Sequence, residues 1–572
     1  MRGRLVVRVM RVLFVIALAS TWHLAAQSLS ARIYPDQTVR QLDREVIGQA
    51  IWHSYQPYFW DLKSQRLLDE AEKLIIALQP AMVGHYPGVG VVTHDFHWKN
   101  LIGPIESRSD PTPRHRTFDT PLQVHFGPDE YGRMLEQLRE LTGQNVEGSI
   151  QVNIMTGSAD DAADWVEYMN APNDGSNPGG GTDWAAVRAK NGHPEPYNIR
   201  YWEFGNEPHF TAANMGSLKA WEYIERINEF APLMKERDPS ILLAGYVNPF
   251  NASHHSQIGI DLPDLPAGPG PSGTESGLTW SQAVIRYAGR NLDLLYFHWF
   301  GAWNENQHDS QYTLSTMYTG LVRWLDRLRG DIDRYAPDIQ TRNRLRRVAI
   351  PEWNAYGGFT PPIATGTAML GALANSRILH IFTQRPEIVM AQRFGLAAPF
   401  PEPEVQAWTP EILDIREGYF AILNKDDGTD YLPTAVYEME RLWAKAYQPY
   451  VVKAEVEGAP TGTFGVPLLD VTALRSPLGD KINLVINNAS ASSRSISFSI
   501  DQYDLQSAAT IWRLRGEGLK DNNTYLDKHR VRIEESTLSL SGNPLSIEVP
   551  PYSITLILLQ GSYPQDPLRR FN

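Results

Sequence analysis

Two glutamates follow apolar stretches that end in polar residues. Glu207 stands in Asn206-Glu207-Pro208 after the apolar run 199–204, and Glu352 follows the run 347–350. A retaining glycosidase needs two carboxyls about 5 Å apart, one to protonate the leaving oxygen and one to attack the anomeric carbon. The sequence therefore predicts Glu207 and Glu352 as a catalytic pair, provided that two strands deliver them to the same end of a sheet. The alternative is a pair of carboxylates in unrelated salt bridges.

Apolar strands alternate with amphipathic helices after residue 46. We expect strands at residues 46–52, 81–86, 149–155, 199–204, 241–247, 292–300, 347–350 and 388–396. We expect helices at residues 66–78, 129–141, 217–235, 313–335 and 365–382. Eight strand–helix units predict an α/β fold, a (β/α)₈ TIM barrel in which strands 4 and 7 open on the same face. A doubly wound open sheet is the alternative, but no glycine-rich phosphate loop follows the first strand.

The helical pattern stops near Ala459. Short alternating strands are expected at residues 468–474, 482–487, 495–500, 508–513, 537–540 and 554–559, separated by turn residues. This pattern predicts a C-terminal antiparallel β-sandwich domain. The expected organisation is a signal peptide at 1–26, a strand at 31–45 that joins the sandwich, a catalytic barrel at 46–450 and the sandwich at 451–562.

The N-terminus and the composition limit location and partners. Four arginines precede the apolar run 12–19, which is too short to cross a bilayer, and Ala-Leu-Ala and Leu-Ala-Ala sequences offer cleavage sites. These features predict a secretory signal and a secreted or periplasmic protein, with no membrane association after signal removal; an uncleaved anchor is the alternative. The net charge of −13 disfavours nucleic acid as a partner. There is no cysteine, so thiolate chemistry is excluded.

The sequence resembles the α-L-arabinofuranosidases of family 51, within the large clan of retaining barrel glycosidases, over nearly the whole chain after the signal. The matching segments are Ile47-Gly48-Gln49, Phe96-His97-Trp98-Lys99 with Gly103-Pro104, Ala162 to Tyr168, Ala189 to Tyr197, Trp202 to Glu207, and Glu352-Trp353-Asn354. The resemblance implies a barrel with a C-terminal sandwich, net retention, no metal or cofactor, and a homo-oligomer as a candidate assembly. It also implies that Glu207 is the acid/base and Glu352 the nucleophile. For those roles we expect a raised pKa at Glu207.

Three departures from the family pattern concern the sugar pocket. Trp52 stands where the family usually has a sugar-binding Glu, His85-Tyr86-Pro87-Gly88-Val89 replaces Arg-Tyr-Pro-Gly-Gly, and the aromatic strand end reads His298-Trp299-Phe300. Losing a carboxylate that grips furanose hydroxyls removes charge-assisted hydrogen bonds. We therefore keep the substrate open: an arabinofuranoside, another furanoside or a hexopyranoside chain.

Further residues at predicted strand ends are candidate sugar contacts. Asn206 can donate to a hydroxyl beside the reacting carbon, and His298 can keep the nucleophile ionised. The other candidates are Trp52, His85, Tyr86, Asn153, Trp299, Trp303 and Gln392. Core packing is the alternative for each aromatic residue. The predicted function is a secreted retaining glycoside hydrolase acting on a carbohydrate; the alternatives are a non-catalytic carbohydrate-binding barrel and a structural cell-surface protein.

Overall fold

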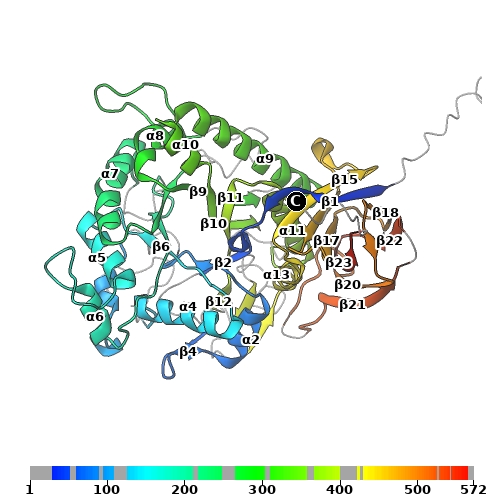
Figure 1. The fold of residues 1–572 in the computed structure, drawn as a ribbon, viewed down its shortest axis with the longest axis horizontal. Coiled ribbons are helices and arrows are strands. Elements are labelled where there is room, and N and C mark those ends of the chain that lie inside the picture. The colour runs from blue at the N-terminus through cyan, green and yellow to red at the C-terminus, as the bar shows by residue number, and fades with distance from the viewer. Residues whose placement is uncertain are drawn as a thin grey trace, which may run out of the picture.

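The structure is a computed structural model. It describes residues 29–51, 59–88, 95–108, 125–209, 217–247, 264–302, 310–356, 366–399, 421–424, 430–524, 527–540 and 543–563. Within these residues the chain forms a barrel surrounded by helices and a second, mainly antiparallel sheet beside it (Figure 1).

Eight parallel strands form the barrel, in the order β5-β2-β11-β10-β9-β8-β7-β6. They are β2 (Gly48–Ala50), β5 (Val83–Gly84), β6 (Ser149–Val152), β7 (Tyr201–Phe204), β8 (Leu242–Tyr246), β9 (Leu294–Ala302), β10 (Val348–Tyr356) and β11 (Ile388–Phe394). Parallel bridges from Met82 to Glu147 and from Tyr86 to Ile150 join β5 to β6 and close the ring. Each strand lies within a stretch predicted from apolar patterning, or overlaps it, and the predicted barrel is confirmed.

Helices between successive strands cover the outside of the barrel (Figure 1). They are α2 (Asp69–Ala77), α4 (Pro128–Thr142), α5 (Ala159–Asn170), α6 (Trp184–Lys190), α7 (Ala220–Arg237), α8 (Trp280–Tyr287), α9 (Ser310–Tyr335), α10 (Ile339–Leu345), α11 (Met369–Gln384) and α13 (Ala435–Ala446). In α4, proline occupies the first turn, where its missing N–H costs nothing. The helix ends at Gly143, whose φ of 62° suits glycine. Its spaced apolar residues, Tyr131 to Leu138, face the core.

Short strand pairs extend the barrel ends. These are β3 (Trp60–Asp61) with β4 (Arg66–Leu67), and β12 (Ala397–Pro399), β13 (Ile422–Asn424) and β14 (Tyr431–Pro433) in a three-stranded sheet. The helix expected at 66–78 was therefore placed too early. Arg66 and Leu67 pair with Asp61 and Trp60, so α2 begins only at Asp69.

The second sheet follows the path β21-β20-β23-β17-β16-β15-β1-β18-β22. Its strands are β1 (Ser30–Gln41), β15 (Tyr450–Glu457), β16 (Leu469–Arg475), β17 (Lys481–Asn488), β18 (Arg494–Ile500), β19 (Asp504–Leu505), β20 (Ala508–Arg515), β21 (Arg532–Ser539), β22 (Leu545–Val549) and β23 (Ser553–Ser562). Ile511 near one end of this path and Ile547 near the other share one apolar core, so the sheet folds over into a sandwich. The N-terminal β1 runs antiparallel to β15 and parallel to β18.

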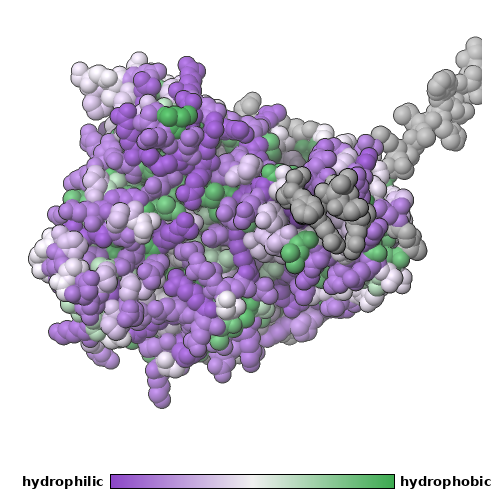
Figure 2. Space-filling model, in the orientation of Figure 1, coloured by the Kyte–Doolittle hydropathy of each residue, from purple (hydrophilic) through white to green (hydrophobic). Residues whose placement is uncertain are grey.

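The surface shown in Figure 2 is predominantly hydrophilic, with hydrophobic residues in small separate patches. Among the described residues, no helix combines the length and the apolar character needed to cross a membrane.

A buried ion pair joins the barrel to the sandwich. Arg377 of α11 donates through Nε to Asp470 Oδ2 of β16 at 2.7 Å, and both side chains are less than 5% exposed. The guanidinium also donates to the carbonyl oxygens of Leu314 and Pro467. One side chain therefore satisfies acceptors from both units.

We expect Arg377→Ala to lower the free energy of unfolding by about 3–5 kcal/mol, because it leaves the Asp470 carboxylate buried without its guanidinium. Urea denaturation followed by circular dichroism measures the change. Arg32→Ala is the matched control, because the Arg32–Asp501 pair is largely exposed and its loss should leave stability unchanged. Equal effects of the two substitutions would contradict the assignment.

Candidate active site

The end of β7 places Glu207. Gly205 has a φ of 77° and Glu207 a φ of 43°, so the chain turns sharply through the left-handed region directly after the strand. A Cβ atom at Gly205 would lie 2.9 Å from Ile154, which restricts the position to glycine. The hydroxyl of Tyr296 donates to the carbonyl oxygens of Phe204 at 3.1 Å and Gly205 at 2.7 Å. These bonds hold a strained turn that points Glu207 into the barrel mouth.

Glu352 lies on β10, directly beside His298 of β9. In the pairing of β10 with β9, Glu352 lies opposite His298. The register shifts just before this point, between Ala349 and Glu352. Because side chains alternate along a strand, paired positions in parallel neighbours face the same side. His298 and Glu352 therefore both point into the barrel.

His298 joins the two catalytic candidates. Its Nδ1 lies 3.0 Å from Glu207 Oε1 and 3.3 Å from Glu352 Oε2. Two contacts through one atom keep these oxygens closer than the roughly 6.5–9.5 Å that separates the carboxyl groups of inverting glycosidases. The Glu207 side chain is 30% exposed and that of Glu352 is 8% exposed. Glu207 thus lies on the solvent side of the pair.

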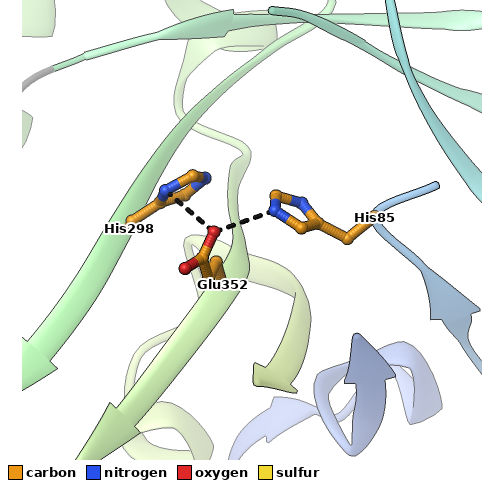
Figure 3. A group of neighbouring side chains, drawn as sticks. All are labelled: His85, His298 and Glu352. Carbon is orange, nitrogen blue, oxygen red and sulfur yellow. Dashed lines mark hydrogen bonds and ion pairs between the residues drawn. The ribbon is translucent and has the colours of Figure 1, made fainter. Parts of the chain in front are cut away.

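A second histidine contacts Glu352 from the opposite side (Figure 3). His85 follows β5 with a φ of 66°, and its Nε2 lies 2.9 Å from Glu352 Oε2. Its Nδ1 lies 3.2 Å from Glu203 Oε2, on β7. Five side chains therefore alternate in one row, which we call the carboxylate–imidazole row: Glu203, His85, Glu352, His298 and Glu207.

Two members of the site were not predicted from the sequence. Glu203 and Gln151 are both buried inside the barrel. The Gln151 amide nitrogen lies 2.9 Å from both ring nitrogens of His85 and donates to Asn206 Oδ1 at 2.8 Å. A charged residue within the apolar strand before Glu207 was the available signal for Glu203, since a buried carboxylate needs a partner.

His85, His298 and Glu352 present three atoms close enough together to consider a metal ion. The two imidazole nitrogens, however, both contact the same oxygen of Glu352 at hydrogen-bond distance. A nitrogen that donates a proton has no lone pair for a metal. The arrangement fits a hydrogen-bonded row.

The expectation of a raised pKa at Glu207 is wrong for this arrangement. Burial opposes ionisation of the carboxyl, but the hydrogen bond from His298 and the nearby positive charge of His298, His209 and His85 outweigh it and lower the pKa of Glu207 to about 2. The expectation followed from the acid/base role of Glu207, and it assigned His298 to Glu352 without anticipating that the same ring also contacts Glu207.

The structure brings only some of the remaining candidates to the carboxylates. Asn206 lies beside them with its oxygen held by Gln151. The other candidates lie at core or loop positions. Tyr86 stacks on Tyr131, and Trp299 lies against Gly320 of α9. Gln392 donates to the Ser149 hydroxyl, and the Asn153 side chain accepts from the backbone N–H groups of Met155 and Thr156. Trp299 alternates with His298 and so faces outward, which removes it from the predicted rim. Trp52 and Trp303 lie outside the described residues.

Comparisons with known proteins were made on sequence and on fold. Residues 77–264 match the family described as Alpha-L-arabinofuranosidase 1 domain, a region that contains Glu207 but not Glu352. A probable α-L-arabinofuranosidase C of Aspergillus fumigatus is 35% identical over 158 residues, 28% of each chain. An intracellular exo-α-(1→5)-L-arabinofuranosidase 1 of Bacillus subtilis is 23% identical over 313 residues, 54% of each chain. The matches thus span between a quarter and about half of these relatives.

Solved structures cover more of the chain. An α-L-arabinofuranosidase from Thermotoga maritima has a TM-score of 0.72 at 19% identity, covering 93% of this chain and 100% of its own. The GH51 α-L-arabinofuranosidase from Thermotoga petrophila has a TM-score of 0.71 at 20% identity with the same coverage. These comparisons confirm the resemblance predicted from the motifs. By sequence over residues 77–264 and by fold over nearly all of its length, the chain is similar to the family 51 α-L-arabinofuranosidases.

Proposed function

We propose that the protein is a retaining glycoside hydrolase, with Glu352 as nucleophile and Glu207 as acid/base. The observation that supports this most is the contact of one imidazole nitrogen, His298 Nδ1, with both carboxylates. That contact keeps the two carboxylates closer together than an inverting mechanism needs, which supports double displacement. The greater exposure of Glu207 suits the group that must meet the leaving oxygen and then a water molecule.

The reaction has two balanced steps. In the first, a Glu352 oxygen attacks the anomeric carbon, the bond to the leaving oxygen breaks, and a proton passes from Glu207 to that oxygen. In the second, Glu207 takes a proton from water, the water oxygen attacks the anomeric carbon, and the ester bond to Glu352 breaks. Two inversions at the same carbon give net retention.

The proton for the first step is one hydrogen bond away from Glu207. A carboxylate oxygen only accepts, so a proton must lie between His298 Nδ1 and Glu207 Oε1 across their 3.0 Å contact. The lowered pKa of Glu207 keeps its carboxyl ionised before a substrate binds. A sugar that excludes water and presents its glycosidic oxygen favours transfer of the proton to Glu207, which becomes the general acid.

For the substrate we propose an α-L-arabinofuranoside. This proposal rests on the family model that matches residues 77–264 and on the arabinofuranosidases that are similar to this chain in sequence. The alternative is another furanoside or a hexopyranoside chain, favoured by Trp52 at the position of a sugar-binding Glu. A carbohydrate-binding barrel without catalysis is disfavoured by the row of partners around both carboxylates.

We expect Glu352→Ala to lower kcat by about 10⁴-fold or more on 4-nitrophenyl α-L-arabinofuranoside, because no other group can form the glycosyl ester. Glu207→Ala should lose about 10²–10⁴-fold on alkyl leaving groups and much less on 2,4-dinitrophenyl glycosides, which need no general acid. Azide should rescue Glu207→Ala and give a glycosyl azide of the substrate's anomeric configuration, detected by NMR.

Glu225→Ala, at an exposed position of α7, is the control and should keep full activity. Full activity in either site variant would overturn the assignment of the catalytic pair.

A panel of aryl glycosides tests the substrate. We expect turnover of the α-L-arabinofuranoside with release of the same anomer. The ¹H NMR spectrum of the first-formed product measures its anomeric configuration. Turnover of a β-D-pyranoside alone would replace the arabinofuranoside proposal. Absence of turnover on every aryl glycoside and polysaccharide tried would favour the non-catalytic alternative.

We also propose export through the N-terminal segment. The arginines before the apolar run 12–19, the small-residue motif that ends the run and a second such motif at 24–26 support this. We expect the mature protein outside the cytoplasm, beginning at Ser20 or Gln27 when its terminus is sequenced. A cytoplasmic protein that retains Met1 or Arg2 would contradict the proposal.

A further inference from the structure

We propose that Glu203 is a positioning residue, which acts through His85 to keep a cation against the nucleophile Glu352. The inference rests on the proposed function for the role of Glu352, but its structural half does not. Glu203 lies on β7, four residues before Glu207, and does not contact the reacting atoms.

The two carboxylates that face His85 favour a charged ring. Nδ1 faces Glu203 Oε2 at 3.2 Å and Nε2 faces Glu352 Oε2 at 2.9 Å. A neutral imidazole carries one N–H and can donate to only one of two carboxylates, whereas an imidazolium donates to both. The side chains of His85 and Glu203 are completely buried and that of Glu352 is 8% exposed, so solvent screens these contacts little.

Among the groups around His85, Glu203 is the carboxylate that, together with Glu352, balances the positive charge of the ring. Burial acts to lower the pKa of His85, but the hydrogen bonds and charges of Glu203 and Glu352 raise it to about 9. The His298 ring packs edge-on at 5.2 Å, and Gln151 is neutral. Glu207 is a third carboxylate in the row. The phenols of Tyr246 and Tyr296 have raised pKa values and stay neutral.

Removal of Glu203 changes the nucleophile's surroundings in a defined direction. Without it, His85 keeps the hydrogen bond to Glu352 but loses one acceptor and one negative charge. Its pKa then falls toward the ordinary value of about 6.5. Above that pH the neutral ring no longer places a positive charge beside the Glu352 carboxylate. The loss is therefore on the alkaline side, while activity at low pH is kept.

The first test is the pH dependence of kcat and KM on 4-nitrophenyl α-L-arabinofuranoside. In the wild type the alkaline limb reports the loss of a proton from the carboxylate–imidazole row, to which His85 contributes with its pKa raised to about 9. Glu203→Gln should move this limb down by at least about one pH unit. At pH values above the limb, kcat should then be about tenfold lower than in the wild type, while KM stays within about twofold. Glu203→Asp keeps the charge and should restore the limb. His85→Arg keeps a fixed cation and should move the limb upward.

The second test needs no turnover. The titration of His85 is followed by NMR of protein carrying ¹³C-labelled histidine, with the His85→Arg spectrum to assign the resonance. Glu203→Gln should shift this titration down by at least about one pH unit. Glu130→Gln is the matched control. Glu130 lies in α4 and forms a buried ion pair with Arg108, so the substitution also removes one buried negative charge. It should leave the alkaline limb and the His85 titration unchanged.

The outcomes separate the two proposals. An unchanged His85 titration in Glu203→Gln overturns the inference, whatever the activity. If the wild type hydrolyses no glycoside but the titration shifts, the proposed function fails and the coupling of Glu203 to His85 stands. Should Glu203→Gln fail to fold, as judged by circular dichroism, the Glu203→Gln/His85→Arg double variant decides. It should fold and keep the high alkaline limb, because a guanidinium needs no second carboxylate to stay charged; failure to fold would show a purely structural role.

Discussion

The alternation of charge along the carboxylate–imidazole row is the constraint on which the site depends. A buried carboxylate is costly unless a donor satisfies it, and here Glu203, Glu352 and Glu207 each face a histidine ring. The row crosses strands β7, β9 and β10 and the residue after β5. Only a closed barrel brings these four chain segments together, so the bridges that link β5 to β6 are as necessary to the chemistry as the side chains.

Backbone strain is present at two points where the row meets the strand ends. His85 and Glu207 both adopt positive φ values without being glycine, a conformation that costs about 1–3 kcal/mol unless surrounding structure enforces it. The enforcing contacts are visible at β7, where the hydroxyls of Tyr223 and Tyr296 hold the carbonyl oxygen of Phe204. The same turn directs Glu207 toward His298 and away from the strand axis. The local conformation therefore serves the geometry of the pair and not the stability of the strand.

Sequence patterning was sufficient for the barrel because strand and helix periods differ and each strand is buried on both faces. It was sufficient for Glu207 and Glu352 because both follow predicted strands. It was not sufficient for Trp299 and Tyr86, since a strand end does not show which side a residue faces until register is known. Glu203 was missed for a related reason: a single charge inside an apolar strand becomes meaningful only when its partner, His85, is brought from more than a hundred positions away. The direction of the Glu207 pKa depended on the same kind of distant contact.

The row also means that protonation belongs to the group and not to single residues. Glu352 Oε2 is shared by His85 and His298, so a proton gained or lost at one ring changes the field at both catalytic carboxyls. The low pKa of Glu207 and the high pKa of His85 follow from the same arrangement. Each carboxylate stabilises the neighbouring cation, and each ring stabilises the neighbouring anion. Because Glu352 lies in the middle of the row, it contacts both rings, while Glu207 at the exposed end contacts the His298 ring. In the proposed mechanism, this asymmetry lets Glu207 cycle between protonated and ionised forms during the two steps while Glu352 stays ready to attack.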